Sequence, residues 1–137
     1  MSPPPVFFLD RALGNKVFPD VLVAAGLAIE RHADHFAQDA PDLDWIPAVA
    51  ERGWYALTQD KRILKNRVER EAVIASGLGF FYLTGANSDM LAIAHNFIAS
   101  HAAVLRFISR TERPFIASVQ RGKDGKAGRV EPRWPNS

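Results

Sequence analysis

The feature that most constrains the fold is a repeated alternation between short apolar runs and segments with helical periodicity. The apolar runs show no polar alternation, so a strand formed by any of them would be buried on both faces. Strands are predicted over residues 6–10, 27–32, 54–58, 78–84 and 113–119. Because helical patterns separate these runs, the sequence predicts a three-layer α/β/α domain with a mainly parallel sheet of about five strands.

The segments between the strands carry start and stop signals of helices. Pro19 suits the first turn of the first helix, and Asp42 is a residue type that caps the second. The third helix is expected to be broken near Asn66, and the fourth to be capped by Asn87 or Ser88. The predicted helices span residues 15–26, 42–53, 60–77 and 87–111.

The chain has 137 residues, which predicts a single domain over 1–137 with a core of about 6–119. Residues 120–137 are basic and rich in glycine and proline, and they are expected to form a hairpin or a tail. No apolar run approaches the ~18 residues of a membrane span, and no signal peptide is recognised. Cysteine is absent, which excludes disulfides and thiolate metal sites and is compatible with the cytoplasm, where we expect the protein.

Charge is unevenly distributed along the chain. Residues 1–60 carry four basic and nine acidic side chains, whereas residues 106–137 carry eight basic and three acidic ones. An acidic first half suits cation binding and a basic end suits a polyanion. Charge also fluctuates along chains that bind neither, so the asymmetry alone does not decide between these interpretations.

Three carboxylates are expected at one edge of the sheet. Asp10 ends the first strand, Asp60 follows the third by two residues, and Asp42 opens the helix between the second and third strands. The carboxyl ends of parallel strands meet at one edge, where functional clefts of such sheets lie. Close carboxylates repel one another, and a hard divalent cation with oxygen ligands removes that repulsion. The sequence therefore predicts a Mg²⁺ or Mn²⁺ site at these acids, with Asp44 and Asp89 as weaker candidates.

Each of these acids has a structural alternative except the first. Asp42 and Asp60 can cap the helices that follow them, and Asp89 lies in a capping sequence. Asp10 comes directly after apolar strand residues and has no helix to cap. His32 and His35 lie at a spacing loosely compatible with zinc, but no third or fourth soft ligand accompanies them.

A cluster of cations follows Asp60. Lysine and arginine contacts to phosphates supply most of the non-specific affinity of proteins for nucleic acids. The alternative is a solvated helix face whose cations pair with Glu69 and Glu71. The residues that we assign to nucleic-acid phosphates are Lys61, Arg62, Lys65 and Arg67.

Several stretches together resemble a known family. "FFLDRALG", "DHFAQDAPDLDWIPAVAERGWYALTQDKRI" and "RPFIASV" are similar to the short PIN-like domains, close to the VapC-type toxin ribonucleases of toxin–antitoxin pairs. The resemblance runs from about residue 6 to residue 119. An apolar strand ending in Asp, a "PD..W" helix start and a "GW..LT.D.RI" strand exit are specific as a combination.

The resemblance implies a metal-dependent endoribonuclease that cleaves RNA and is held inactive by a cognate antitoxin protein. Asp10 would be the family's first acid, Asp42 the acid at the helix start and Asp60 the acid after the "LT" strand, with Thr58 as a supporting hydroxyl. Larger PIN domains carry a fourth acid and often a helical insertion. This chain lacks the insertion and offers only Asp44 and Asp89 for the fourth acid.

Two other functions are compatible with the same fold. One is an RNA- or protein-binding module without catalysis. The other is a receiver-like signalling domain, in which Asp60 would accept a phosphoryl group with Thr84 nearby. Receivers have an acidic pair after the first strand and a lysine at the end of the fifth, whereas this chain has Arg11 and Gln120 there. A homodimer is left open, and no membrane association is expected.

Overall fold

The computed structural model describes residues 4–13, 16–85, 89–123 and 126–135. Its described part contains one six-stranded sheet in the order β2-β1-β3-β4-β5-β6, whose first five strands pair in parallel and whose last pair is antiparallel. The strands are β1 (Val6–Leu9), β2 (Ala28–Arg31), β3 (Tyr55–Thr58), β4 (Gly79–Leu83), β5 (Phe115–Val119) and β6 (Val130–Trp134). The predicted α/β fold is confirmed, with one strand more than expected.

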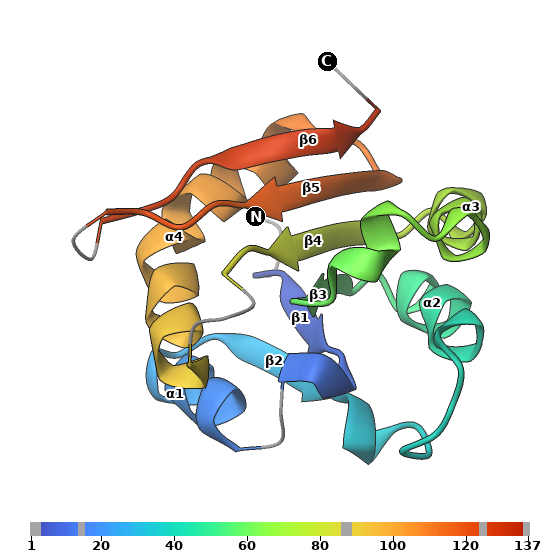
Figure 1. Cartoon of the computed structure of the whole chain (residues 1–137), viewed down its shortest axis with the longest axis horizontal. Helices are drawn as coiled ribbons and strands as arrows, with labels where there is room; N and C mark the ends of the chain where they lie inside the picture. The colour runs from blue at the N-terminus through green and yellow to red at the C-terminus, as the bar shows by residue number, and fades with distance from the viewer. Residues whose placement is uncertain (1–3, 14–15, 86–88, 124–125, 136–137) are drawn as a thin grey trace.

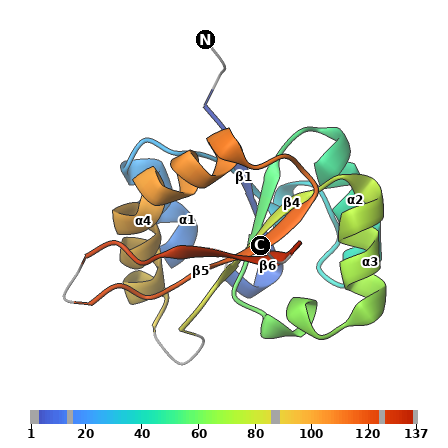
Figure 2. The same cartoon turned by 90° about the horizontal axis from the view of Figure 1, so that it is seen from above.

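Helices cover both faces of the sheet. Figure 1 and Figure 2 both show α1 and α4 together on one side of the sheet and α2 and α3 together on the other. The α-helices are α1 (Val17–Ala24), α2 (Asp42–Glu51), α3 (Arg67–Ser76) and α4 (Met90–Arg110). Short 3₁₀ helices follow three of the strands: η1 (Arg11–Leu13), η2 (His32–Asp34) and η3 (Lys61–Leu64). The three-layer architecture is therefore the one that the sequence predicts.

The sheet separates two apolar cores. Phe7 and Leu9 of β1 pack into the core beneath α1 and α4, whereas Phe8 between them packs with Trp45 and Val73 beneath α2 and α3. All three β1 side chains are at most 1% exposed. Successive side chains of a strand point to opposite faces, so a central strand between two helical layers must be apolar throughout.

Helix boundaries follow the predicted signals with one exception. The predicted break near Asn66 is confirmed, because its side chain accepts a hydrogen bond from the Glu69 N–H at 3.0 Å and so starts α3 anew. Asp89 caps α4 through the Ala92 N–H, whereas the predicted caps Asn87 and Ser88 lie outside the described residues. The predicted cap at Asp42 is wrong.

The residue before α2 explains that error. Pro41 occupies the N-cap position with an extended backbone, so Asp42 is already the first helical residue. Proline disfavours helical geometry in the residue before it and supplies no capping side chain. The Asp42 carboxylate is therefore available for other contacts.

The region after β5 forms a hairpin. β6 pairs with β5 in an antiparallel register that places Val130 opposite Val119, and Figure 1 shows the two strands side by side at one edge of the sheet. Of the two arrangements that the sequence left open for 120–137, the hairpin is therefore the one observed.

Helix α4 has the length and the apolar composition of a membrane span, with 33% of its most apolar window buried inside the protein. Its buried residues include Phe97, Val104 and Phe107, which belong to the core that it forms with α1 and the sheet.

Candidate active site

Asp10 lies immediately after β1, at the carboxyl edge of the sheet. Its backbone N–H donates to the Leu57 carbonyl of β3 at 3.2 Å, so the neighbouring strand fixes its position. The side chain is 8% exposed. One carboxylate oxygen accepts from the Ala12 N–H at 2.9 Å, and the other accepts from the Thr58 hydroxyl. This acid is thus buried, held in place and directed by two donors.

The environment of Asp10 opposes its negative charge. Burial raises the pKa of Asp10 to about 7, and the charges of Asp42 and Asp60 act in the same direction. The hydrogen bonds from Thr58 and Ala12 lower the pKa but do not offset the burial. No cation bonded to Asp10 compensates for the burial within the described part of the chain. A buried carboxylate in this state is stabilised strongly by any cation that reaches it.

Thr58 connects Asp10 to the next acid. It is the last residue of β3, 1% exposed, and its hydroxyl accepts a hydrogen bond from the Asp60 N–H at 3.0 Å while donating to Asp10. Both functions of the hydroxyl are therefore used between the two acids. A β-branched side chain has few χ1 rotamers, so the hydroxyl has a fixed direction.

Asp60 is bound to Arg62. The Asp60 carboxylate caps η3 by accepting the Arg62 N–H at 3.0 Å, and it accepts the guanidinium Nε at 2.9 Å and Nη2 at 2.6 Å. These bonds to Arg62 lower the pKa of Asp60. The capping alternative for Asp60 is therefore observed. The Arg62 side chain is 80% exposed. If a metal cation displaced Arg62 from Asp60, water would therefore solvate the released guanidinium.

Asp42 meets a fourth acid from α3. One Asp42 oxygen accepts from the buried Trp45 indole Nε1 at 2.9 Å. The Asp42 carboxylate also hydrogen bonds to the side chain of Glu69. Burial first, and then the bond to Asp42 and its charge, raise the pKa of Glu69 to about 7. Two carboxyl groups that hydrogen bond to each other are stable together when they share a proton or a cation.

Glu69 is a residue that the sequence interpretation missed, because it was grouped with Glu71 as a partner for surface cations. Only Glu71 has that role, since it accepts from Arg67 Nε at 3.0 Å. The available signal was helical periodicity: Glu69 lies four residues before Val73, the buried residue of α3, and therefore on the same face of that helix.

The four acids line one small hollow, which we call the acid pocket. Its volume is about 10 Å³, roughly the space of one water molecule or one small cation. Apolar side chains form part of its wall, and Asp10 is buried there, whereas Asp42, Asp60 and Glu69 are partly exposed. The lining residues are Asp10, Asp42, Trp45, Ile46, Thr58, Asp60, Ile63, Glu69 and Phe80.

The remaining predicted site residues lie elsewhere. Asp44 is exposed in the first turn of α2 and Asp89 caps α4, and neither belongs to the acid pocket. Lys61 and Lys65 are exposed at η3 beside the pocket, whereas Arg67 is paired with Glu71. Of the predicted acids, the structure brings Asp10, Asp42 and Asp60 to one place.

The two histidines of "HADH" are separated by their contacts. His35 Nε2 lies 2.7 Å from the Glu30 carboxylate and its Nδ1 lies 3.1 Å from Arg52 Nη1. His32 is buried and takes no part in these contacts. The pair is therefore not arranged as two ligands of one ion.

Comparison with known proteins decides the family. The sequence model of the PIN like domain matches residues 5–85, which contain all four acids of the pocket. The chain belongs to the PIN-like domain family. A relative in Mycobacterium tuberculosis (strain ATCC 25618 / H37Rv), named "Putative ribonuclease VapC45", is 35% identical over 120 residues, covering 85% of this chain and 86% of the relative. No solved structure matches. The resemblance read from the sequence is thereby confirmed, and the receiver-like alternative is excluded.

This PIN-like domain does not hold a ready-made metal centre. In the part of the chain that the structure describes, no three His, Asp or Glu side chains are grouped so that they could bind one ion as they stand. The contacts above give the reason, since the Asp60 carboxylate is occupied by Arg62 and the Asp42 carboxylate by Trp45 and Glu69.

The donor chemistry of the acid pocket nevertheless fits a hard cation. All four candidate ligands are carboxylates, which Mg²⁺ and Mn²⁺ prefer. Two of the four, Asp10 and Glu69, have pKa values raised to about 7, so the pocket is short of positive charge. A divalent cation would stabilise both ionised carboxylates, and its arrival would require Arg62 to leave Asp60.

Proposed function

We propose that this PIN-like domain is a Mg²⁺- or Mn²⁺-dependent endoribonuclease, the toxin of a toxin–antitoxin pair, that hydrolyses phosphodiester bonds of RNA. The observation that carries the proposal is the acid pocket, in which four carboxylates surround a hollow of single-ion size around buried Asp10. The similarity to a relative named as a ribonuclease over most of both chains supports it.

Asp10, Asp42 and Asp60 would hold the ion, with Glu69 as the fourth acid in place of the sequence candidates Asp44 and Asp89. A bound divalent cation supplies Lewis-acid stabilisation of phosphate charge and a water of lowered pKa. Asp10 is the anchor of the set, because burial and two hydrogen bonds hold its oxygens in fixed directions.

The remaining residues orient the acids. The Thr58 hydroxyl fixes Asp10, because it is itself held by the Asp60 N–H. The Trp45 indole holds one Asp42 oxygen, and the hydrogen bond to Glu69 keeps these two acids together. The burial of Asp10 lowers the local dielectric around that acid and strengthens its electrostatic contacts.

The cations after Asp60 would bind RNA phosphates that flank the cleaved bond. Lys61 and Lys65 are exposed beside the acid pocket and are the first contacts. Arg62 would exchange Asp60 for a phosphate when the ion binds, whereas Arg67 would first have to leave Glu71. Phosphate contacts of this kind position RNA without reading its sequence.

The partners in this proposal are RNA and a cognate antitoxin protein, and the location is the cytoplasm without membrane association. A homodimer is left open in this proposal, and sedimentation of the purified chain measures the assembly directly. The antitoxin would inhibit by covering the acid pocket or its cations.

The decisive experiment is cleavage of a single-stranded RNA by purified protein in Mg²⁺ or Mn²⁺, with EDTA as the blank. Asp10→Asn should abolish cleavage while its circular dichroism matches the wild type. Asp44→Asn is the matched control, since it removes an exposed acid of the same helix turn as Asp42 and should leave activity unchanged. Full activity in Asp10→Asn would defeat the assignment.

One observation favours a second candidate, an RNA-binding PIN-like module without catalysis. The Arg62 guanidinium already neutralises Asp60, so the pocket could persist without a metal. RNA binding that is equal in EDTA and in Mn²⁺, with no cleavage in either, would support this module over the nuclease.

A further inference from the structure

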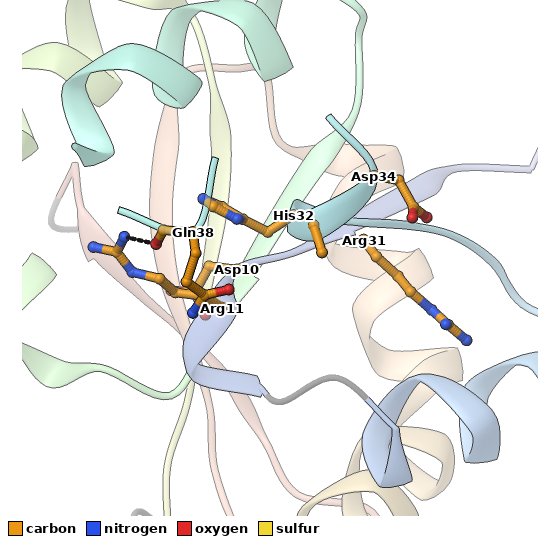
Figure 3. A pocket seen from close by; sticks show the side chains of 7 residues that line it. Asp10, Arg11, Arg31, His32, Asp34 and Gln38 are labelled. Atoms are coloured by element: carbon orange, nitrogen blue, oxygen red, sulfur yellow. Dashed lines mark hydrogen bonds between the residues drawn. The ribbon is translucent and has the colours of Figure 1, made fainter. Parts of the chain in front are cut away.

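A second hollow lies directly beside the acid pocket and shares Asp10 with it. Its volume is about 130 Å³, and we call it the histidine pocket. Figure 3 shows His32 on the same side as Asp10, Arg11 and Gln38, whereas Arg31 and Asp34 point the other way. The residues that line it are Asp10, Arg11, Arg31, His32, Ala33, Asp34 and Gln38. A ligand in this hollow would therefore touch the acid that anchors the proposed nuclease site.

His32 is the unexplained group of this pocket. It is 3% exposed, and neither ring nitrogen has a hydrogen-bond partner among the described residues. Its ring packs against Phe36 at a centroid distance of 5.6 Å and against Phe8 at 6.1 Å. Buried polar atoms in folded proteins are almost always paired, so two unpaired nitrogens on one ring indicate a partner that the chain itself does not supply.

The charge of the ring restricts what that partner is. Burial, followed by the nearby charge of Arg11, lowers the pKa of His32, while Asp42 acts weakly in the opposite direction. The neutral ring has one N–H donor and one nitrogen acceptor. A phosphate oxygen can accept from the N–H of the ring but leaves the acceptor nitrogen without a donor. The hydroxyls of a ribose and the edge of a base offer both donors and acceptors, so they can pair with both ring nitrogens.

The walls of the pocket are held in place. The Arg11 guanidinium donates to the Gln38 carbonyl at 2.6 Å and to the Ala40 carbonyl at 3.1 Å, which ties the segment after η2 to the end of β1 (Figure 3). The His32 carbonyl accepts from the Phe36 N–H at 2.9 Å and closes the turn that carries the ring. A preformed hollow with fixed walls binds a ligand at a lower entropic cost than a mobile one.

We propose that the histidine pocket binds the ribonucleoside next to the scissile phosphate, with the His32 ring nitrogens hydrogen bonded to its ribose hydroxyls or base edge. This inference rests on the proposed ribonuclease function and adds to it a subsite that recognises RNA rather than any polyanion. Because Asp10 lines both pockets, a nucleoside in the histidine pocket would be the RNA residue adjacent to the phosphate at the acid pocket.

The test is a titration of the full chain with each of the four ribonucleosides, and separately with inorganic phosphate, in EDTA. Binding is followed by NMR of the His32 ring and by calorimetry. We expect at least one ribonucleoside to shift the His32 ring resonances. His32→Phe should weaken that binding by about tenfold, the loss expected for a missing hydrogen bond to a buried group.

Two further variants separate binding from folding. His32→Gln keeps a donor and an acceptor and should retain more of the affinity than His32→Phe. His101→Phe is the matched control: His101 also packs against two phenylalanine rings, Phe7 at 6.1 Å and Phe97 at 6.3 Å, but in the core on the opposite face of the sheet. It should bind like the wild type. His32→Phe should unfold at no lower urea concentration than the wild type, because it removes two unpaired polar atoms.

Three results would overturn the inference: no ribonucleoside affects His32, phosphate alone reproduces the shift, or His32→Phe binds as well as the wild type. Because the titration needs neither metal nor cleavage, a failed nuclease assay leaves its outcome unaffected. A nuclease that is active with an unresponsive His32 refutes the subsite alone.

Discussion

The unfavourable state of Asp10 predicts that replacing it with asparagine stabilises the metal-free protein at high pH. The pKa of Asp10 is about 7 in the folded protein and 3.8 for an exposed aspartate. Because the folded pKa is the higher one, the unfolded chain ionises first as the pH rises. Stability is therefore lost between about pH 4 and pH 7 and does not fall further above that range.

The size of the effect follows from the shift. About three pKa units at 1.36 kcal/mol each amount to about 4 kcal/mol lost by the wild type at pH 8. Asparagine keeps an oxygen for the Ala12 N–H but cannot accept the Thr58 hydroxyl in the same way, which costs about 1 kcal/mol. Asp10→Asn should therefore be about 3 kcal/mol more stable than the wild type at pH 8, and under about 1 kcal/mol more stable at pH 5.

The assay is urea unfolding in EDTA at both pH values, followed by tryptophan fluorescence, since Trp45 packs beside the site. The other ionisable groups titrate in both proteins, so their contributions cancel when the free energies of unfolding of wild type and variant are subtracted. Adding Mg²⁺ should stabilise the wild type and not the variant, because only the wild type retains the anchor carboxylate. A stability difference that is the same at pH 5 and pH 8, or a variant less stable than the wild type at pH 8, would refute the reasoning.

Three further variants test the partner of Asp60, the hydroxyl beside Asp10 and the cap of α3. Arg62→Gln removes the partner of Asp60 and should raise Mn²⁺ affinity severalfold in the absence of RNA, measured by calorimetry; unchanged affinity would show that Arg62 does not compete with the ion. Thr58→Val should reduce RNA cleavage about tenfold or more while Thr58→Ser retains most of it, and equal loss in both would mean that the methyl rather than the hydroxyl matters. Asn66→Ala should cost about 1 kcal/mol in urea unfolding by removing the cap of α3, and no change in the midpoint would contradict the capping assignment.

The layer order and most element positions could be predicted because they depend on local patterns. Apolar runs between helical segments require a sheet that is covered on both faces, and the strand before Asp10 and the strand that ends in Thr58 place those two residues at one edge. The strand β6 was only half predicted, since a segment with glycines, prolines and charges satisfies the pattern of a loop as well as that of an edge strand.

The site shows where local patterns stop being sufficient. Glu69 joins the acids only because α3 packs beside α2, a tertiary contact that no short motif encodes. The lack of partners of His32 is likewise invisible in the sequence, because a buried histidine and an exposed one are written with the same letter. Asp60 also turns its carboxylate toward Arg62, two residues later. The sequence does not reveal this pairing, because both side chains could equally well have bonded to other groups.

The measurement that tests the central claim most directly is Mn²⁺ binding by the purified chain at pH 8, followed by electron paramagnetic resonance. Carboxylates gathered around Asp10 should bind one Mn²⁺ per chain, and Asp10→Asn and Glu69→Gln should each weaken binding severely while Asp44→Asn binds like the wild type. Binding that survives Asp10→Asn unchanged, or no binding by the wild type at millimolar Mn²⁺, would contradict it.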